Sequence, residues 1–169
     1  MYQASYMKRI IKLSAFAILL ASLLNLATPV LAHTEGDPYE AVLKAGQYMN
    51  VGKVLVWNDG THLYVKYVTD DWRITETHLY VSTDEPEKAA PGRFDYKMEY
   101  ASPVMEDTFM IALNGWTAGT RLWIAAHAVV LNPDECKDET AWAKGPCHWK
   151  ELPGKSWGWY FWYIVQAPP

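Results

Sequence analysis

The sequence predicts an all-β protein, a single antiparallel β-sandwich of about seven or eight short strands, preceded by a cleavable signal peptide. Two observations predict the sandwich. Short stretches rich in β-branched and aromatic residues alternate with a period of two, and turn signals separate them at intervals of about a dozen residues. After the apolar N-terminal segment, no helical pattern extends beyond two turns.

Residues 1–32 have the parts of an export signal. Three basic residues open it: Lys8, Arg9 and Lys12. An uncharged apolar run, Leu13–Leu24, follows, and Val30–Ala32 is a small-residue cleavage site. The alternative is an uncleaved anchor, but the run is shorter than the ~20 residues that cross a bilayer. We therefore expect a secreted, extracellular or periplasmic protein that begins at His33 and has no membrane span after cleavage.

The composition limits the partners of the exported chain. Removal of residues 1–32 leaves 137 residues. The removed segment holds three basic and no acidic residues, so the net charge changes from −4 to −7. Binding of nucleic acid needs clustered Lys and Arg, so an acidic chain is a poor candidate for it. All nine tryptophans follow the signal, which suits sheets packed by large rings or a surface that stacks on sugars.

The sandwich is expected to begin after a short leader. Residues 33–45 are predicted as an N-terminal leader segment and residues 46–169 as the β-sandwich domain, with the β pattern starting near Gln47. Lys53–Asn58 is rich in Val and Leu, and the Asp-Gly pair that follows is a strong hairpin signal. His62–Thr69 then alternates strictly. One of its faces carries Leu63, Val65 and Tyr67.

Five later strands are expected. They are Trp72–Ser82, a short edge strand within Phe94–Tyr100, Thr108–Leu113, Arg121–Leu131 and Trp157–Val165. One face of the first is predicted to hold Ile74, Glu76, His78 and Tyr80, and the other Thr75, Thr77, Leu79 and Val81. The apolar Arg121–Leu131 is predicted to be a buried central strand. Asn132–Gly154 is expected to be irregular.

Five phrases of the chain form an ordered series. They are Glu76–Val81, Ala90–Lys97, Ile124–Val130, Glu139–Ala143 and Trp159–Tyr163. The series resembles a group of secreted, β-rich bacterial and archaeal modules, and the resemblance covers most of Gly46–Val165. It implies a β-rich fold and an extracellular setting, and it implies no activity.

The chain has two cysteines, Cys136 and Cys147. In an exported protein an even pair predicts a disulfide. Closing that short loop would stabilise the fold by roughly 3 kcal/mol.

Two histidines and two carboxylates are candidate zinc or copper ligands. Glu76 and His78 lie two apart on a predicted strand, so they share a face at a spacing of ~7 Å. His127 lies in an apolar strand, and Glu139 opens a phrase that could fold over it. These are the ligand types of zinc and copper sites. The favoured alternative is a buried network in which His127 hydrogen-bonds a carboxylate.

Cleavage after Ala32 would give His33 a free α-amine beside its imidazole, and these two nitrogens can chelate copper. The arrangement resembles the copper brace of copper-dependent polysaccharide monooxygenases and of some periplasmic copper carriers. The alternative is an ordinary flexible chain end.

Calcium is a further candidate cofactor. Carboxylates cluster around the cysteine-containing segment, at Asp134, Glu135, Asp138 and Glu139, and calcium prefers oxygen ligands. The favoured alternative is a solvated acidic loop, because the spacing is not that of an EF-hand.

Five tryptophans are predicted at strand ends or in loops and are therefore expected not to be wholly buried. They are Trp57, Trp72, Trp116, Trp149 and Trp157. A coplanar set would form a platform for carbohydrate. The favoured alternative is that they cap the ends of the core.

No catalytic constellation is present in the sequence, since no serine lies in a G-x-S-x-G motif and the paired acids lie in predicted turns. We therefore expect an exported, non-catalytic module that binds a glycan or a cell-surface or extracellular-matrix partner, or that self-associates. The alternative is a secreted zinc or copper protein that uses His78, His127 and nearby carboxylates, with or without His33.

Overall fold

The computed structural model describes residues 33–149 and 157–168, and the predicted export signal lies outside them. The described chain is almost entirely β-structure, which confirms the predicted all-β class. The elements are β1 (Tyr39–Ala45), β2 (Met49–Asn58), β3 (His62–Thr69), β4 (Arg73–Ser82), the 3-10 turn η1 (Pro91–Arg93), β5 (Tyr96–Val104), β6 (Glu106–Ala112), β7 (Arg121–Asn132), β8 (Lys137–Ala143), β9 (Cys147–His148) and β10 (Trp159–Ile164). None of the described residues forms a helix long and apolar enough to cross a membrane.

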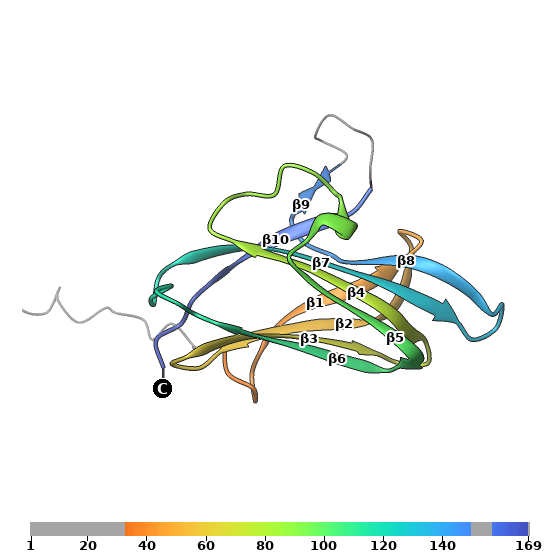
Figure 1. Ribbon diagram of the computed structural model, residues 1–169, viewed down its shortest axis with the longest axis horizontal. Coiled ribbons are helices and arrows are strands. Elements are labelled where there is room, and N and C mark those ends of the chain that lie inside the picture. The colour runs from red at the N-terminus through yellow and green to blue at the C-terminus, as the bar shows by residue number, and fades with distance from the viewer. Residues whose placement is uncertain (1–32, 150–156, 169) are drawn as a thin grey trace, which may run out of the picture. The chain divides into compact units, whose positions relative to one another are not determined.

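The strands pair antiparallel in the order β5-β4-β7-β8-β1-β2-β3-β6. β10 pairs with the first part of β7, and the short β9 pairs with β10. The sheet folds over so that its two halves face each other (Figure 1), which confirms the predicted antiparallel sandwich. At one corner β5 continues into β6 through Met105, whose carbonyl accepts a hydrogen bond from the Thr69 backbone N–H at 2.9 Å. This segment joins the two edge strands, so the sheet is nearly closed.

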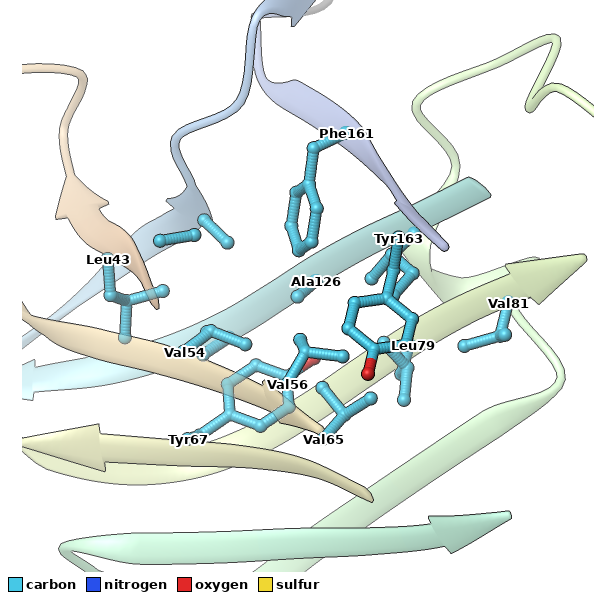
Figure 2. Packing of buried hydrophobic residues seen from close by; sticks show 14 of the residues in the cluster. Leu43, Val54, Val56, Val65, Tyr67, Leu79, Val81, Ala126, Phe161 and Tyr163 are labelled. Carbon is cyan, nitrogen blue, oxygen red and sulfur yellow. The ribbon is translucent and has the colours of Figure 1, made fainter. Parts of the chain in front are cut away.

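The main core lies between the two halves of the sheet. Leu63, Val65 and Tyr67 of β3 are fully buried, as their alternation predicted. Figure 2 shows side chains from both halves that meet there, among them Leu43, Val54, Leu79 and Phe161. Full burial of an apolar side chain such as these contributes about 1.5–3 kcal/mol to stability.

A second apolar cluster lies on the outer face of β7 and β8. Its buried members are Phe94, Ala125, Trp142, Trp149 and Tyr160. Trp142 points outward because its neighbours Ala141 and Ala143 belong to the main core. The β4–β5 connection and β9 lie over this face (Figure 1), and this explains how a sheet can be buried on both sides.

The sheet begins earlier than the sequence indicated. Residues 39–45, predicted as part of a leader, form β1 and pair with β2 along its length. The buried face of β1 holds Ala41, Leu43 and Ala45. Alanine is depleted in strands, so this short stretch carries a weak strand signal although it completes the sheet.

Part of Asn132–Gly154, predicted as irregular, also forms strands. β8 pairs with β7 from His127 to Asn132, and β9 pairs with β10. The first half of β8 is polar and only Ala141, Trp142 and Ala143 are buried, so its alternation is hard to recognise in the sequence.

The predicted disulfide between Cys136 and Cys147 is wrong, because the structure does not form it. Cys136 precedes β8 and Cys147 follows it in β9. β8 has seven residues, and a strand of that length spans about 23 Å. A disulfide needs Cα atoms within about 7 Å of each other.

Cys136 is expected to react with iodoacetamide in the folded, unreduced protein, since it lies exposed in the β7–β8 turn and thiol reactivity needs access. Mass spectrometry of the Cys136 peptide measures the modified fraction. A peptide cross-linked between Cys136 and Cys147 would contradict the placement of these residues at opposite ends of β8.

Candidate functional site

Trp57 and Tyr64 form a stacked pair of rings on the outer face of the β2–β3 hairpin. They are register partners, with ring centroids 5.1 Å apart and planes inclined by 8°. Their chain neighbours Val56 and Val65 point into the core, so strand alternation turns both rings outward, where they are partly exposed. Each ring covers one face of the other, and Tyr64 has Met110 of β6 as its register partner on the other side.

Asp59 organises the turn between these two strands. Its Oδ1 accepts hydrogen bonds from the backbone N–H groups of Thr61 at 2.6 Å and His62 at 2.7 Å, and its Oδ2 accepts one from the Tyr64 hydroxyl at 2.8 Å. These bonds hold the pKa of Asp59 well below its usual range, and the bond from the Thr61 backbone has the largest effect. The carboxylate therefore stays ionised at neutral pH and orients the Tyr64 ring.

An open groove of about 450 Å³ lies beside the ring pair. Polar residues line it together with the two rings: Thr34, Glu35, Asn58, Asp59, Lys66 and Thr108. The Lys66 ammonium is already paired with Glu106 at 2.7 Å. The groove thus combines an aromatic surface with a few hydrogen-bonding groups, the composition of small-molecule sites in general.

None of the other four candidate tryptophans lines this groove. Trp72 and Trp116 pack partly buried against the main core, and Trp157 packs against the outer cluster. Trp149, expected to be incompletely buried, is instead only 2% exposed within the outer cluster. The five tryptophans are therefore distributed over separate places, and Trp57 alone among them stacks on a ring at the groove.

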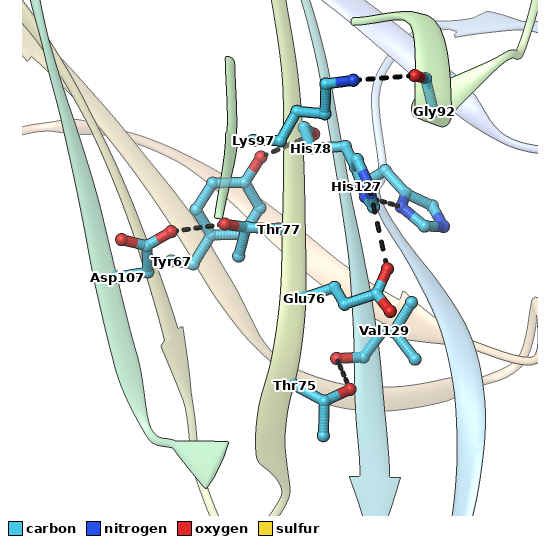
Figure 3. Close-up of polar contacts among 10 residues, drawn as sticks. All are labelled: Tyr67, Thr75, Glu76, Thr77, His78, Gly92, Lys97, Asp107, His127 and Val129. Carbon is cyan, nitrogen blue, oxygen red and sulfur yellow. Dashed lines mark hydrogen bonds and ion pairs between the residues drawn. The ribbon is translucent and has the colours of Figure 1, made fainter. Parts of the chain in front are cut away.

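The two histidines predicted as metal ligands are direct neighbours. His78 on β4 and His127 on β7 are register partners, and their Nδ1 atoms lie 3.2 Å apart (Figure 3). One ring donates and the other accepts this hydrogen bond. Glu76 contacts the other ring nitrogen of His78, with 3.8 Å between its Oε2 and Nε2. His127 also packs edge-on against Trp142, with centroids 4.7 Å apart.

Burial makes this a neutral pair at pH 7. It lowers the pKa of His127 to about 3, and the adjacent His78 adds to the effect. Burial also lowers the pKa of His78, against the opposing effect of Glu76. The single shared hydrogen bond satisfies both buried Nδ1 atoms. The sequence suggested a carboxylate as the partner of His127, whereas the structure places His78 there.

Two further predicted ligands are not brought to the pair. His127 faces Trp142 across β7 and β8, and Glu139 lies three residues from Trp142 on β8, so it points to the opposite face of the sheet. His33 packs on Tyr163, whose partner on β7 is Leu122. Leu122 is five residues from His127, about 16 Å along an extended strand.

The acidic residues proposed for calcium are also dispersed. Asp134 and Glu135 lie exposed in the β7–β8 turn, while the adjacent Asp138 and Glu139 of β8 point to opposite faces. Within residues 33–149 and 157–168, no group of three or more His, Cys, Asp or Glu side chains is arranged to hold a metal ion. Zinc, copper and calcium binding stay predictions.

Of the residues that line the groove, sequence reasoning proposed only Trp57 as a ligand-binding residue and missed Tyr64 and Asp59, among others. The alternation of His62–Thr69 places Tyr64 on the outer face of the hairpin with Trp57. A two-residue Asp59-Gly60 turn would put His62 opposite Trp57, but in the structure Asp59 pairs with His62 around Gly60 and Thr61, so Tyr64 lies opposite Trp57. Outside the groove, Trp162 is another partly exposed tryptophan that sequence reasoning did not single out. It is 40% exposed, stacks edge-on with Trp123 and lies 5.7 Å from the guanidinium of Arg121.

In comparisons with known proteins, no protein-family model, curated protein or solved structure matches the chain. The resemblance to secreted β-rich modules therefore stays a prediction.

Proposed function

We propose that the protein is an exported, non-catalytic module that binds glycan at Trp57 and Tyr64. The observation that supports this best is the parallel stack of two partly exposed rings beside a groove with polar walls. A sugar presents apolar C–H faces that pack on aromatic rings and hydroxyls that hydrogen-bond, so it needs both kinds of surface. The signal-like segment 1–32 supports an extracellular setting.

Replacement of Trp57 by alanine is expected to weaken glycan binding by about tenfold or more, a loss of about 1.4 kcal/mol. Tyr64 would lose its stacking partner, and a sugar would lose an aromatic face. Retention on insoluble cellulose, chitin, xylan and mannan, followed by titration calorimetry with the retained polysaccharide's soluble fragments, measures the change.

Trp162→Ala is the matched control, because Trp162 is a partly exposed tryptophan on β10 that lines none of this groove. This variant is expected to bind like the unmodified protein. Failure of the unmodified protein to bind any of the four polysaccharides would overturn the proposal, and so would equal binding by the Trp57→Ala variant.

A second candidate function is metal binding by His78 and His127. The favouring observation is the 3.2 Å separation of their Nδ1 atoms, close to the roughly 3.3 Å between two imidazole ligands on a tetrahedral zinc ion. Glu76 contacts His78 at its other nitrogen, so further ligands would have to be water or another molecule. Elemental analysis of tag-free protein after incubation with zinc or copper tests this candidate, and finding neither metal eliminates it.

A further inference from the structure

We propose that the ligand is an uncharged glycan chain of several sugars, which runs from the Trp57–Tyr64 groove across Asp59 into a second pocket at Trp116. This inference rests on the proposed function, since it extends the same site. It specifies the class of glycan and the path that the chain follows over the protein surface.

The second pocket adjoins the first. It has a volume of about 480 Å³ and lies where the β2–β3 turn meets the β6–β7 loop and the segment after β10. Asp59 lines both pockets, so a ligand chain that passes over this one side chain reaches from one to the other. In the second pocket the aromatic residue is Trp116, and Thr61, Asn114 and Gln166 supply polar groups.

Hydrogen bonds between the three segments hold the walls of the second pocket. The Leu113 N–H donates to the Thr61 carbonyl at 2.9 Å, and the Gly119 N–H donates to the Val165 carbonyl at 2.8 Å. The Gln166 N–H donates to the Asn58 side-chain oxygen at 2.8 Å. The pocket is therefore formed before a ligand arrives, which limits the entropy lost on binding.

The charges along this path disfavour an anionic ligand. Glu35 and Asp59 line the first pocket, where Lys66 is neutralised by Glu106. Of the described residues that line the second pocket, Asp59 alone is charged. The Asp59 carboxylate stays ionised, and its Oδ2 carries one bond, from Tyr64, in the described structure. A carboxylate oxygen can accept a second bond, so a neutral sugar hydroxyl fits there and a uronate or phosphate is repelled.

Titration calorimetry with neutral cello-, manno- and chito-oligosaccharides of one to six sugars tests the proposal, with oligogalacturonates as anionic probes. We expect the affinity for the best neutral series to rise about tenfold or more from the disaccharide to the hexasaccharide. Trp116→Ala is expected to remove this gain and to leave disaccharide binding unchanged. Because Trp116 also packs on the core, Ala118→Arg provides a second variant, which fills the pocket from an exposed loop position.

The outcomes separate the two proposals. If both variants bind the hexasaccharide as the unmodified protein does while Trp57→Ala loses binding, the second pocket is wrong and glycan binding stands. Tighter binding of oligogalacturonates than of neutral chains overturns the assignment of an uncharged ligand. If Trp57→Ala binds every chain normally, or if the unmodified protein binds none, the proposed function itself is wrong.

Discussion

Replacement of Gly52 by alanine is expected to destabilise the fold by about 3 kcal/mol, because the added methyl group overlaps backbone atoms. Gly52 has φ 152° and lies in β2 between β1 and β3. A Cβ at this position would lie 2.0 Å from the Val68 carbonyl oxygen and 2.7 Å from the Thr69 Cα. Both atoms belong to the neighbouring strand, so the overlap is relieved only by separating β2 from β3.

Thermal unfolding followed by circular dichroism measures this effect, and we expect a decrease in Tm of roughly 10 °C. Gly92→Ala is the matched control: a Cβ there would have no heavy atom within 4 Å. Such a surface substitution is expected to change stability by no more than about 0.5 kcal/mol. Equal melting temperatures for the two variants would contradict the close approach of β3 to Gly52.

The same position shows why strand registers were only partly predictable. β2 carries a bulge there, since Leu43 pairs with Gly52 and the next residue of β1, Lys44, pairs with Asn50. A bulge adds one residue to one strand and shifts all later side chains relative to the partner. Sequence alternation gives the face of a residue but contains no direct signal for this extra residue.

β4 illustrates the consequence. From Glu76 onward the predicted faces are confirmed, with Thr77, Leu79 and Val81 buried on the inner side. Ile74 was predicted on the face of Glu76, but it lies in the main core. The register shift between Ile74 and Glu76 makes Thr75 the additional residue, and its hydroxyl donates to the Val129 carbonyl.

The candidate sites differ in how far the sequence could define them. The Trp57–Tyr64 pair lies in a local hairpin, so alternation places both rings on one face, but the Asp-Gly signal gives a register two residues away from the observed one. The His78–His127 pair joins β4 to β7, across a separation of 49 residues. Alternation correctly placed Glu76 and His78 on one face, but no local rule specifies which residue of β7 lies opposite. Trp149 was misjudged because β9 brings a loop residue onto the outer cluster.

Acidification from pH 7 to pH 5 is expected to reduce the free energy of unfolding by about 2 kcal/mol through His127 alone. The folded state holds the pKa of His127 at about 3, below the value of 6.5 of an ordinary histidine. Between these values the unfolded chain binds the proton and the folded chain does not. The contribution of His127 to the free energy of unfolding is therefore complete above pH 6.5. It decreases by about 1.4 kcal/mol for each pH unit as the pH falls toward 3.

The surroundings of the pair explain why neither imidazole readily becomes an imidazolium cation. His127 faces the ring of Trp142 and the Nδ1 of His78, and among the described residues no carboxylate opposes the lowering of its pKa by burial and by His78. The charges near the pair act on His78: Glu76 and Glu99 raise its pKa, and Lys97 lowers it. Protonation of both rings would place two N–H donors 3.2 Å apart and abolish the shared hydrogen bond.

Urea unfolding of the unmodified protein and of the His127→Gln variant at pH 7, 6 and 5 measures this dependence. The glutamine variant is expected to be less stable at pH 7, because the imidazole pair is lost, and to lose less stability on acidification. His62→Gln is the matched control. It removes a partly exposed imidazole at the start of β3 and leaves the buried pair intact, so it is expected to keep the full pH dependence. If His127→Gln loses as much stability between pH 7 and pH 5 as the unmodified protein, the pH dependence arises elsewhere and the buried pair does not control it.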